Sequence, residues 1–131
     1  MGLGSRKVGP EAQRRHAEDQ QSAERLPELV EAVGAARREL RAAQDADAGA
    51  EELNRLGVRL DAALTDAMRA AYARQRALVG PRGLDDRIYR RKRLARPEIK
   101  QATAVAEQLL TMRERHRLHG IVRVPRSPAA V

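Results

Sequence analysis

The chain has 131 residues, carries a net charge of +8 and contains no Cys, Trp or Phe. Without Cys, disulfides, thiolate catalysis and Cys-based zinc sites are excluded. Leu, Val and Ile make up only 26 residues, so the predicted core is thin. We expect association with further copies or with protein partners to supply the missing burial. No apolar run is long enough for a membrane span, and the predicted location is the cytoplasm, or a particle assembled there.

The positive charge is concentrated in the last part of the chain. Residues 80–131 carry thirteen basic and five acidic side chains, whereas residues 1–26 and 27–79 are close to neutral. Such an asymmetry favours an acidic partner for this part, either nucleic acid or a negatively charged protein surface. The alternative interpretation is that the charge serves only solubility.

The first predicted region, residues 1–26, is a polar leader followed by a weak helix. Gly9 and Pro10 end the leader, because Pro suits the first turn of a helix. The stretch from Glu11 to Glu24 is almost entirely polar. It is therefore expected to fray or to bind a partner rather than to form part of a core.

Residues 27–79 are predicted to form a long antiparallel αα-hairpin that serves oligomerisation or docking. Apolar residues recur at spacings of three, four and seven on both sides of the sequence "DADAGAEE", which has the Gly and acidic residues of a turn. A single continuous helix through Gly49 is the alternative. The predicted helix-pairing interface consists of Leu29, Val33, Leu40, Leu53, Leu56, Leu60, Leu64 and Leu78.

Residues 80–131 are predicted to be a basic helical region with an extended C-terminal arm. After the break at "GPRG", a short basic helix spans about Leu84 to Ala95, and Pro97 begins an amphipathic helix that Gly120 ends. The piece from Ile121 to Val124 resembles a short strand. The predicted fold is therefore all-α: a long antiparallel αα-hairpin, a short basic helix and a C-terminal amphipathic helix, with extended N- and C-terminal arms.

No arrangement of residues predicts an enzyme or a bound cofactor. His116 and His119 stand three residues apart, but no third metal ligand follows at a motif spacing. His side chains near the C-terminus of a helix interact favourably with the negative end of the helix dipole. No Ser lies in a nucleophile elbow, and "GPRG" lacks the Lys of a phosphate-binding loop. We expect no catalytic residue, no metal and no cofactor.

The stretch "DDRIYRRKRLARPEIK", residues 85–100, is the strongest candidate for a binding site. On a helical wheel Arg91 projects into the narrow apolar side of its helix. The helix should therefore be either weakly packed or held between the bundle and an anionic surface. The predicted contacts to nucleic acid or an acidic partner are Arg87, Arg90, Arg91, Lys92, Arg93, Arg96, Lys100, Arg123 and Arg126.

Two functions are compatible with these patterns. The first is a non-enzymatic structural subunit of a larger assembly, of the virion or head-to-tail type or in a nucleoprotein particle, whose basic C-terminal half contacts an acidic partner. The alternative is a stand-alone, dimeric nucleic-acid-binding regulator or architectural protein. In both, contacts are expected with phosphates rather than with bases, because the basic region has Tyr89 as its only aromatic residue.

Overall fold

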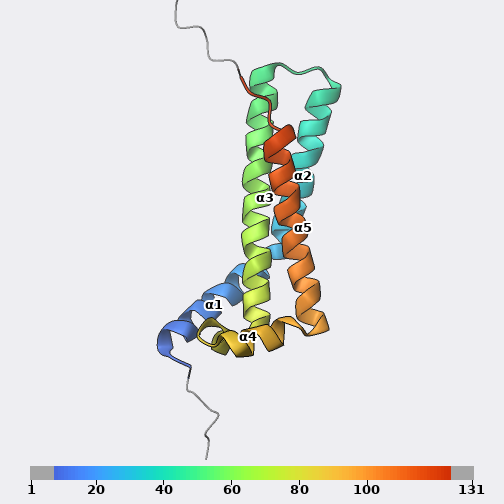
Figure 1. The fold of residues 1–131 in the computed structure, drawn as a ribbon. Coiled ribbons are helices and arrows are strands. Elements are labelled where there is room, and N and C mark those ends of the chain that lie inside the picture. The colour runs from blue at the N-terminus through green and yellow to red at the C-terminus, as the bar shows by residue number, and fades with distance from the viewer. Residues whose placement is uncertain (1–7, 125–131) are drawn as a thin grey trace, which may run out of the picture.

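The structure is a computed structural model, and it describes residues 8–124 of the chain. In this range the chain is helical and contains no strand, so the predicted all-α fold is confirmed (Figure 1). The elements are α1 (Pro10–Glu24), α2 (Leu26–Asp45), α3 (Ala50–Val79), the 3₁₀ turn η1 (Pro81–Leu84), α4 (Arg87–Leu94) and α5 (Pro97–His119).

The helices α2 and α3 form the predicted hairpin, so the alternative of one continuous helix through Gly49 is wrong. The chain leaves α2 at Asp45 and reverses through a tight turn, in which the amide of Ala48 donates to the carbonyl of Ala43 at 2.9 Å. Asp47 adopts a left-handed conformation with φ of 52°, which Asp tolerates better than most residues. The acidic residues Glu51 and Glu52 then occupy the favourable first turn of α3.

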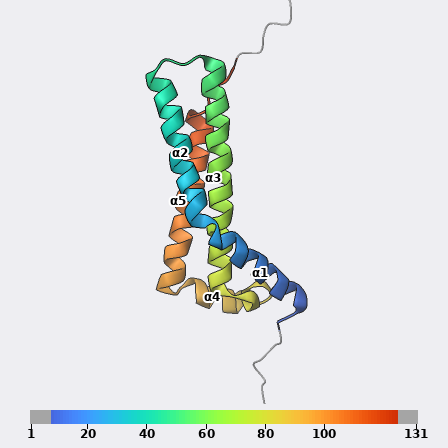
Figure 2. The same cartoon turned by 180° about the vertical axis from the view of Figure 1, so that it is seen from behind.

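The central element is α3, against which α1, α2 and α5 all pack (Figures 1 and 2). α5 runs alongside α3 and buries Ile99, Ala102, Ala106 and Leu109. By contrast, α2 and α5 do not pack closely against each other. The core is therefore built from the contacts that the other helices make with α3. The helices do not form a closed bundle in which every neighbour packs against the next.

Most of the predicted pairing interface is buried within this single chain. Val33, Leu40, Leu56, Leu60 and Leu64 are buried, and Leu29 and Leu53 are partly buried against the same cluster. This cluster also contains Ala106 and Leu109 of α5. The leucines of the predicted pairing interface are thus largely buried within the chain itself.

Leu78 is a correction to that predicted interface, because 36% of its surface is exposed. Leu64 and Leu78 are two heptads apart, and a straight helix drifts by about 20° for every heptad. The last turns of α3 bury Ala70, Ala73 and Val79 instead.

The polar helix α1 is docked on α3, although the sequence predicted a fraying or partner-bound segment. Ala12 is buried, as is Leu26, which follows α1 at the start of α2. The guanidinium of Arg76 on α3 donates two hydrogen bonds to the carboxylate of Asp19, at 3.0 and 3.2 Å. The ion pair of Asp19 and the burial of Ala12 therefore hold this largely polar helix against α3.

The piece from Ile121 to Val124 is not a strand, which corrects the prediction from the sequence. It runs beside the first turns of α3, where the side-chain amide of Asn54 donates to the carbonyl of Val122 at 2.6 Å. No neighbouring strand is present to complete a ladder in the described part of the chain. The remainder of the predicted arms, residues 1–7 and 125–131, lies outside the described residues, and so does Arg126.

Candidate anionic-partner surface

The short helix α4 crosses the end of the bundle at the point where α3 stops (Figure 1). Gly80 ends α3 with φ of 97°, a conformation that other residues rarely adopt. Asp86 then begins α4, because its carboxylate accepts a hydrogen bond from the amide of Tyr89 at 3.0 Å. This bond, together with the nearby Arg82, lowers the pKa of Asp86 below its ordinary value. The "GPRGLDD" segment therefore fixes where α4 begins.

No residue of α4 is buried. Ile88, in the middle of the predicted apolar side, is 71% exposed, whereas Leu84 and Leu94 are partly buried. The helix α4 therefore packs weakly against its own chain. Most of the side chains of this short helix are exposed to solvent.

Six basic side chains around α4 are exposed and form no ion pair with any other described residue. We call them the α4 basic surface: Arg87, Arg90, Arg91, Lys92, Arg96 and Lys100. They come from α4 and from the start of α5, so one short segment places all six at the same end of the molecule (Figure 2). The structure thus brings together most of the contact residues that the sequence predicted.

Two of the predicted contact residues lie apart from this surface. Arg93 is half-buried, and its guanidinium donates to the carbonyl of Leu78 at 2.8 Å, so it anchors α4 to the end of α3. Arg123 is exposed but follows the far end of α5. The 23 residues of α5 correspond to about 35 Å of helix. Arg123 is therefore not part of the α4 basic surface.

Sequence reasoning missed Arg82, which lies at the edge of this surface. Its guanidinium carbon is 4.7 Å from the centroid of the Tyr89 ring, and it pairs with Asp86 at 3.5 Å. No periodic pattern indicated this, because Arg82 lies in the turn before α4. One face of Tyr89 is consequently covered by a cation.

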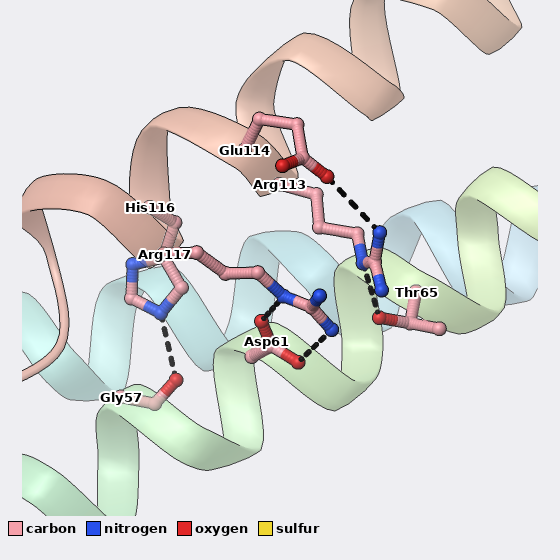
Figure 3. A network of polar contacts seen from close by, with 7 residues as sticks. All are labelled: Gly57, Asp61, Thr65, Arg113, Glu114, His116 and Arg117. Atoms are coloured by element: carbon pink, nitrogen blue, oxygen red, sulfur yellow. Dashed lines mark hydrogen bonds and ion pairs between the residues drawn. The ribbon is translucent and has the colours of Figure 1, made fainter.

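Two arginines near the end of α5, Arg113 and Arg117, contact α3 (Figure 3). Arg117 donates to both carboxylate oxygens of Asp61 on α3, at 2.6 and 3.2 Å. These bonds lower the pKa of Asp61 and raise that of Arg117. One turn earlier, Arg113 donates to the hydroxyl of Thr65 at 2.8 Å. Part of the excess positive charge therefore has a structural role.

His116 also contacts α3, not the end of its own helix as the sequence suggested. Its Nε2 lies 2.7 Å from the carbonyl oxygen of Gly57, and because a carbonyl only accepts, Nε2 must carry the proton. Between residues 8 and 124, no three His, Cys, Asp or Glu side chains are arranged to hold a metal ion.

Within the same range, none of the helices is both long enough and apolar enough to cross a bilayer. Together these features describe a helical protein whose α4 end carries a cluster of exposed cations without ion pairs among the described residues. Comparisons with protein-family models, with curated proteins and with solved structures give no match to this chain.

Proposed function

We propose that this chain is a non-enzymatic helical subunit of a nucleoprotein assembly, and that its α4 basic surface contacts the phosphates of nucleic acid. The observation that supports the proposal is the set of six exposed cations on and beside a helix that buries none of its own residues. A cationic surface of this kind gives an electrostatic attraction to a polyanion that does not depend on base sequence.

The distribution of charge favours a binding role over a solvated surface. Arg87 and Arg91 are four residues apart on α4, and like charges at this spacing destabilise a helix by a few tenths of a kcal/mol. A helix selected only for solubility would intersperse acids with its bases, but α4 itself contains no acid. Phosphates between these side chains would relieve the repulsion.

The expected mode of contact is through the phosphate backbone. Base stacking needs free aromatic faces, and Arg82 covers one face of Tyr89. Arg and Lys side chains on a short exposed helix can reach phosphates from several directions. Binding should therefore show little sequence preference and a strong dependence on salt.

The test is the salt dependence of binding to duplex DNA by the intact chain. The triple variant Arg90→Ala, Arg91→Ala and Lys92→Ala should reduce the slope of log K against log salt by about 0.9 for each phosphate that the variant no longer neutralises. Arg93 is retained, because it anchors α4 to α3. The matched control carries Arg37→Ala, Arg38→Ala and Arg41→Ala, three exposed arginines of α2 with the same change of net charge. An equal reduction of the slope in both variants would contradict a specific role for α4.

The role in an assembly is tested by size-exclusion chromatography with light scattering, before and after nuclease treatment. The chain has two Tyr and no Trp, so bound nucleic acid would dominate the absorbance at 260 nm. We expect a large particle that nuclease converts into smaller species. A monomer that does not bind duplex DNA at low salt would exclude the proposed function.

A further inference from the structure

A groove lies between α2 and α5, which do not pack closely against each other. It has a volume of about 390 Å³. Leu60 and Leu64 of α3 form its floor, and Met112 of α5 lines one wall. Arg37 of α2 and Arg115 of α5 stand at opposite edges. The groove thus combines an apolar interior with two cationic edges.

The surface continues over the last turns of α5. A second hollow, of about 500 Å³, shares Arg115 and His119 with the groove and adds Leu110 and Leu118. Leu118 is 75% exposed, although it lies on a regular helix whose opposite face is packed. Leu118 and Met112 therefore offer apolar contact area on either side of Arg115.

The charges at the edges have no counterpart within the described chain. Arg37 and Arg115 are exposed and take part in no ion pair there. Among the described residues, the only acidic one that lines either hollow is Glu114, and its carboxylate already contacts Arg113 at 3.1 Å. A complementary partner would have to bring carboxylates to both edges.

We infer that this α2/α5 groove docks an acidic amphipathic helix of a partner protein. Its apolar residues would contact Met112 and Leu118, and its flanking carboxylates would pair with Arg37 and Arg115. A helix lying in a groove between two helices is a recurrent mode of recognition. Nucleic acid is not the occupant, because phosphates gain nothing from Leu118 or Met112. This inference is independent of the proposed function, which uses the α4 basic surface.

The probe is a fluorescein-labelled synthetic helix of about 18 residues with Leu at positions i, i+3, i+4 and i+7 of each repeat and Glu elsewhere. Fluorescence anisotropy measures its binding to the intact chain, and amide chemical shifts locate it. We expect the shifts to cluster around Arg37 and from Leu110 to Gly120. The same peptide with Lys in place of Glu should not bind.

Variants at exposed positions test the groove without disturbing the core. The pair Arg37→Glu and Arg115→Glu should weaken peptide binding by at least about tenfold, through repulsion of carboxylates. Leu118→Asp should weaken it by a similar factor. The control pair Arg90→Glu and Arg91→Glu has the same change of charge at the other end of the molecule, and it should change peptide affinity by less than about twofold. Circular dichroism checks that each variant is folded.

Three results would overturn the inference: no binding at about 1 mM peptide, chemical shifts that map to α4, or an equal loss of affinity in the α4 control pair. A fourth such result would be a dimer by light scattering whose amide chemical shifts place the second copy over the groove. Since the DNA experiment uses the other surface, failure of the peptide experiment leaves the proposed function standing, and the converse also holds.

Discussion

Gly83 and Gly34 differ in the atoms that an added Cβ would contact. A Cβ atom at Gly83 would clash with the Cγ1 atom of Val79, which is buried and stiff. At Gly34, in the interior of α2, a Cβ would meet only the end of the flexible Arg38 side chain, at 3.2 Å. The two residues therefore predict opposite effects of the same substitution.

We expect Gly83→Ala to reduce the free energy of unfolding by about 1–3 kcal/mol through overpacking. Gly34→Ala should raise it by about 0.5–1 kcal/mol, because Ala costs less entropy than Gly in a helix. Urea denaturation followed by circular dichroism measures both. A stabilised Gly83→Ala protein would show that the η1 turn is loosely packed.

The ion pair between Asp61 and Arg117 predicts a stability that depends on pH. The pKa of Asp61 is lowered in the folded protein, chiefly by the hydrogen bond from Arg117. Its stabilising effect is thus fully present above the unfolded-state value of about 3.9 and is lost as the pH falls through the lower folded-state value. The difference in urea midpoint between the native chain and Asp61→Asn should be largest near neutral pH and vanish in acid. Asp66→Asn, at an exposed position of the same helix, is the control; an equal pH dependence there would rule out the pair as the cause.

At the scale of the element, α4 depends on its N-cap because packing contributes so little. Asp86 accepts the amide hydrogen bond of Tyr89, whereas its neighbour Asp85 is exposed and makes no such bond. Asp86→Ala should therefore increase hydrogen exchange at the Tyr89 amide several-fold. Asp85→Ala should leave that exchange unchanged. Hydrogen exchange in α3 should be unaffected in both variants. Equal exchange of the Tyr89 amide in the two variants would mean that the cap does not hold α4.

At the scale of the whole molecule, the core is organised around α3. Leu64 and Leu78 belong to the same sequence stripe, but Leu64 is 2% exposed and Leu78 is 36% exposed. We expect Leu64→Ala to lower the free energy of unfolding by about 2–5 kcal/mol. Leu78→Ala should cost less than Leu64→Ala, about 1 kcal/mol, since about a third of Leu78 is already exposed and the truncation leaves no closed cavity. Similar costs, measured by urea denaturation, would contradict the described packing of α3.

The candidate site could be predicted from the sequence only in part. The cluster from Arg87 to Lys100 is contiguous in sequence. Its location on one short helix and on the first turn of the next helix could therefore be predicted. The predicted contact roles of Arg93 and Arg123 could not be separated from those of the other cations by sequence. In the folded chain Arg93 donates to the carbonyl of Leu78, and the length of α5 places Arg123 far from α4. The groove brings together Arg37 and Arg115, which are 78 positions apart in the sequence. No spacing rule connects two such residues.

The sequence by itself determined most of the helices and their ends, because apolar periodicity, proline positions and glycine stops act within a few residues. It placed the start of the basic helix at Leu84, where the structure has the 3₁₀ turn η1, and α4 begins at Arg87. It also determined where the positive charge lies. Only the tertiary structure decided that the leucine stripes are buried within one chain, that α1 docks on α3 through Asp19, and that Arg113 and Arg117 of α5 contact α3. These depend on which helix faces meet, and the same amphipathic stripe can be buried equally well by its own chain or by a partner.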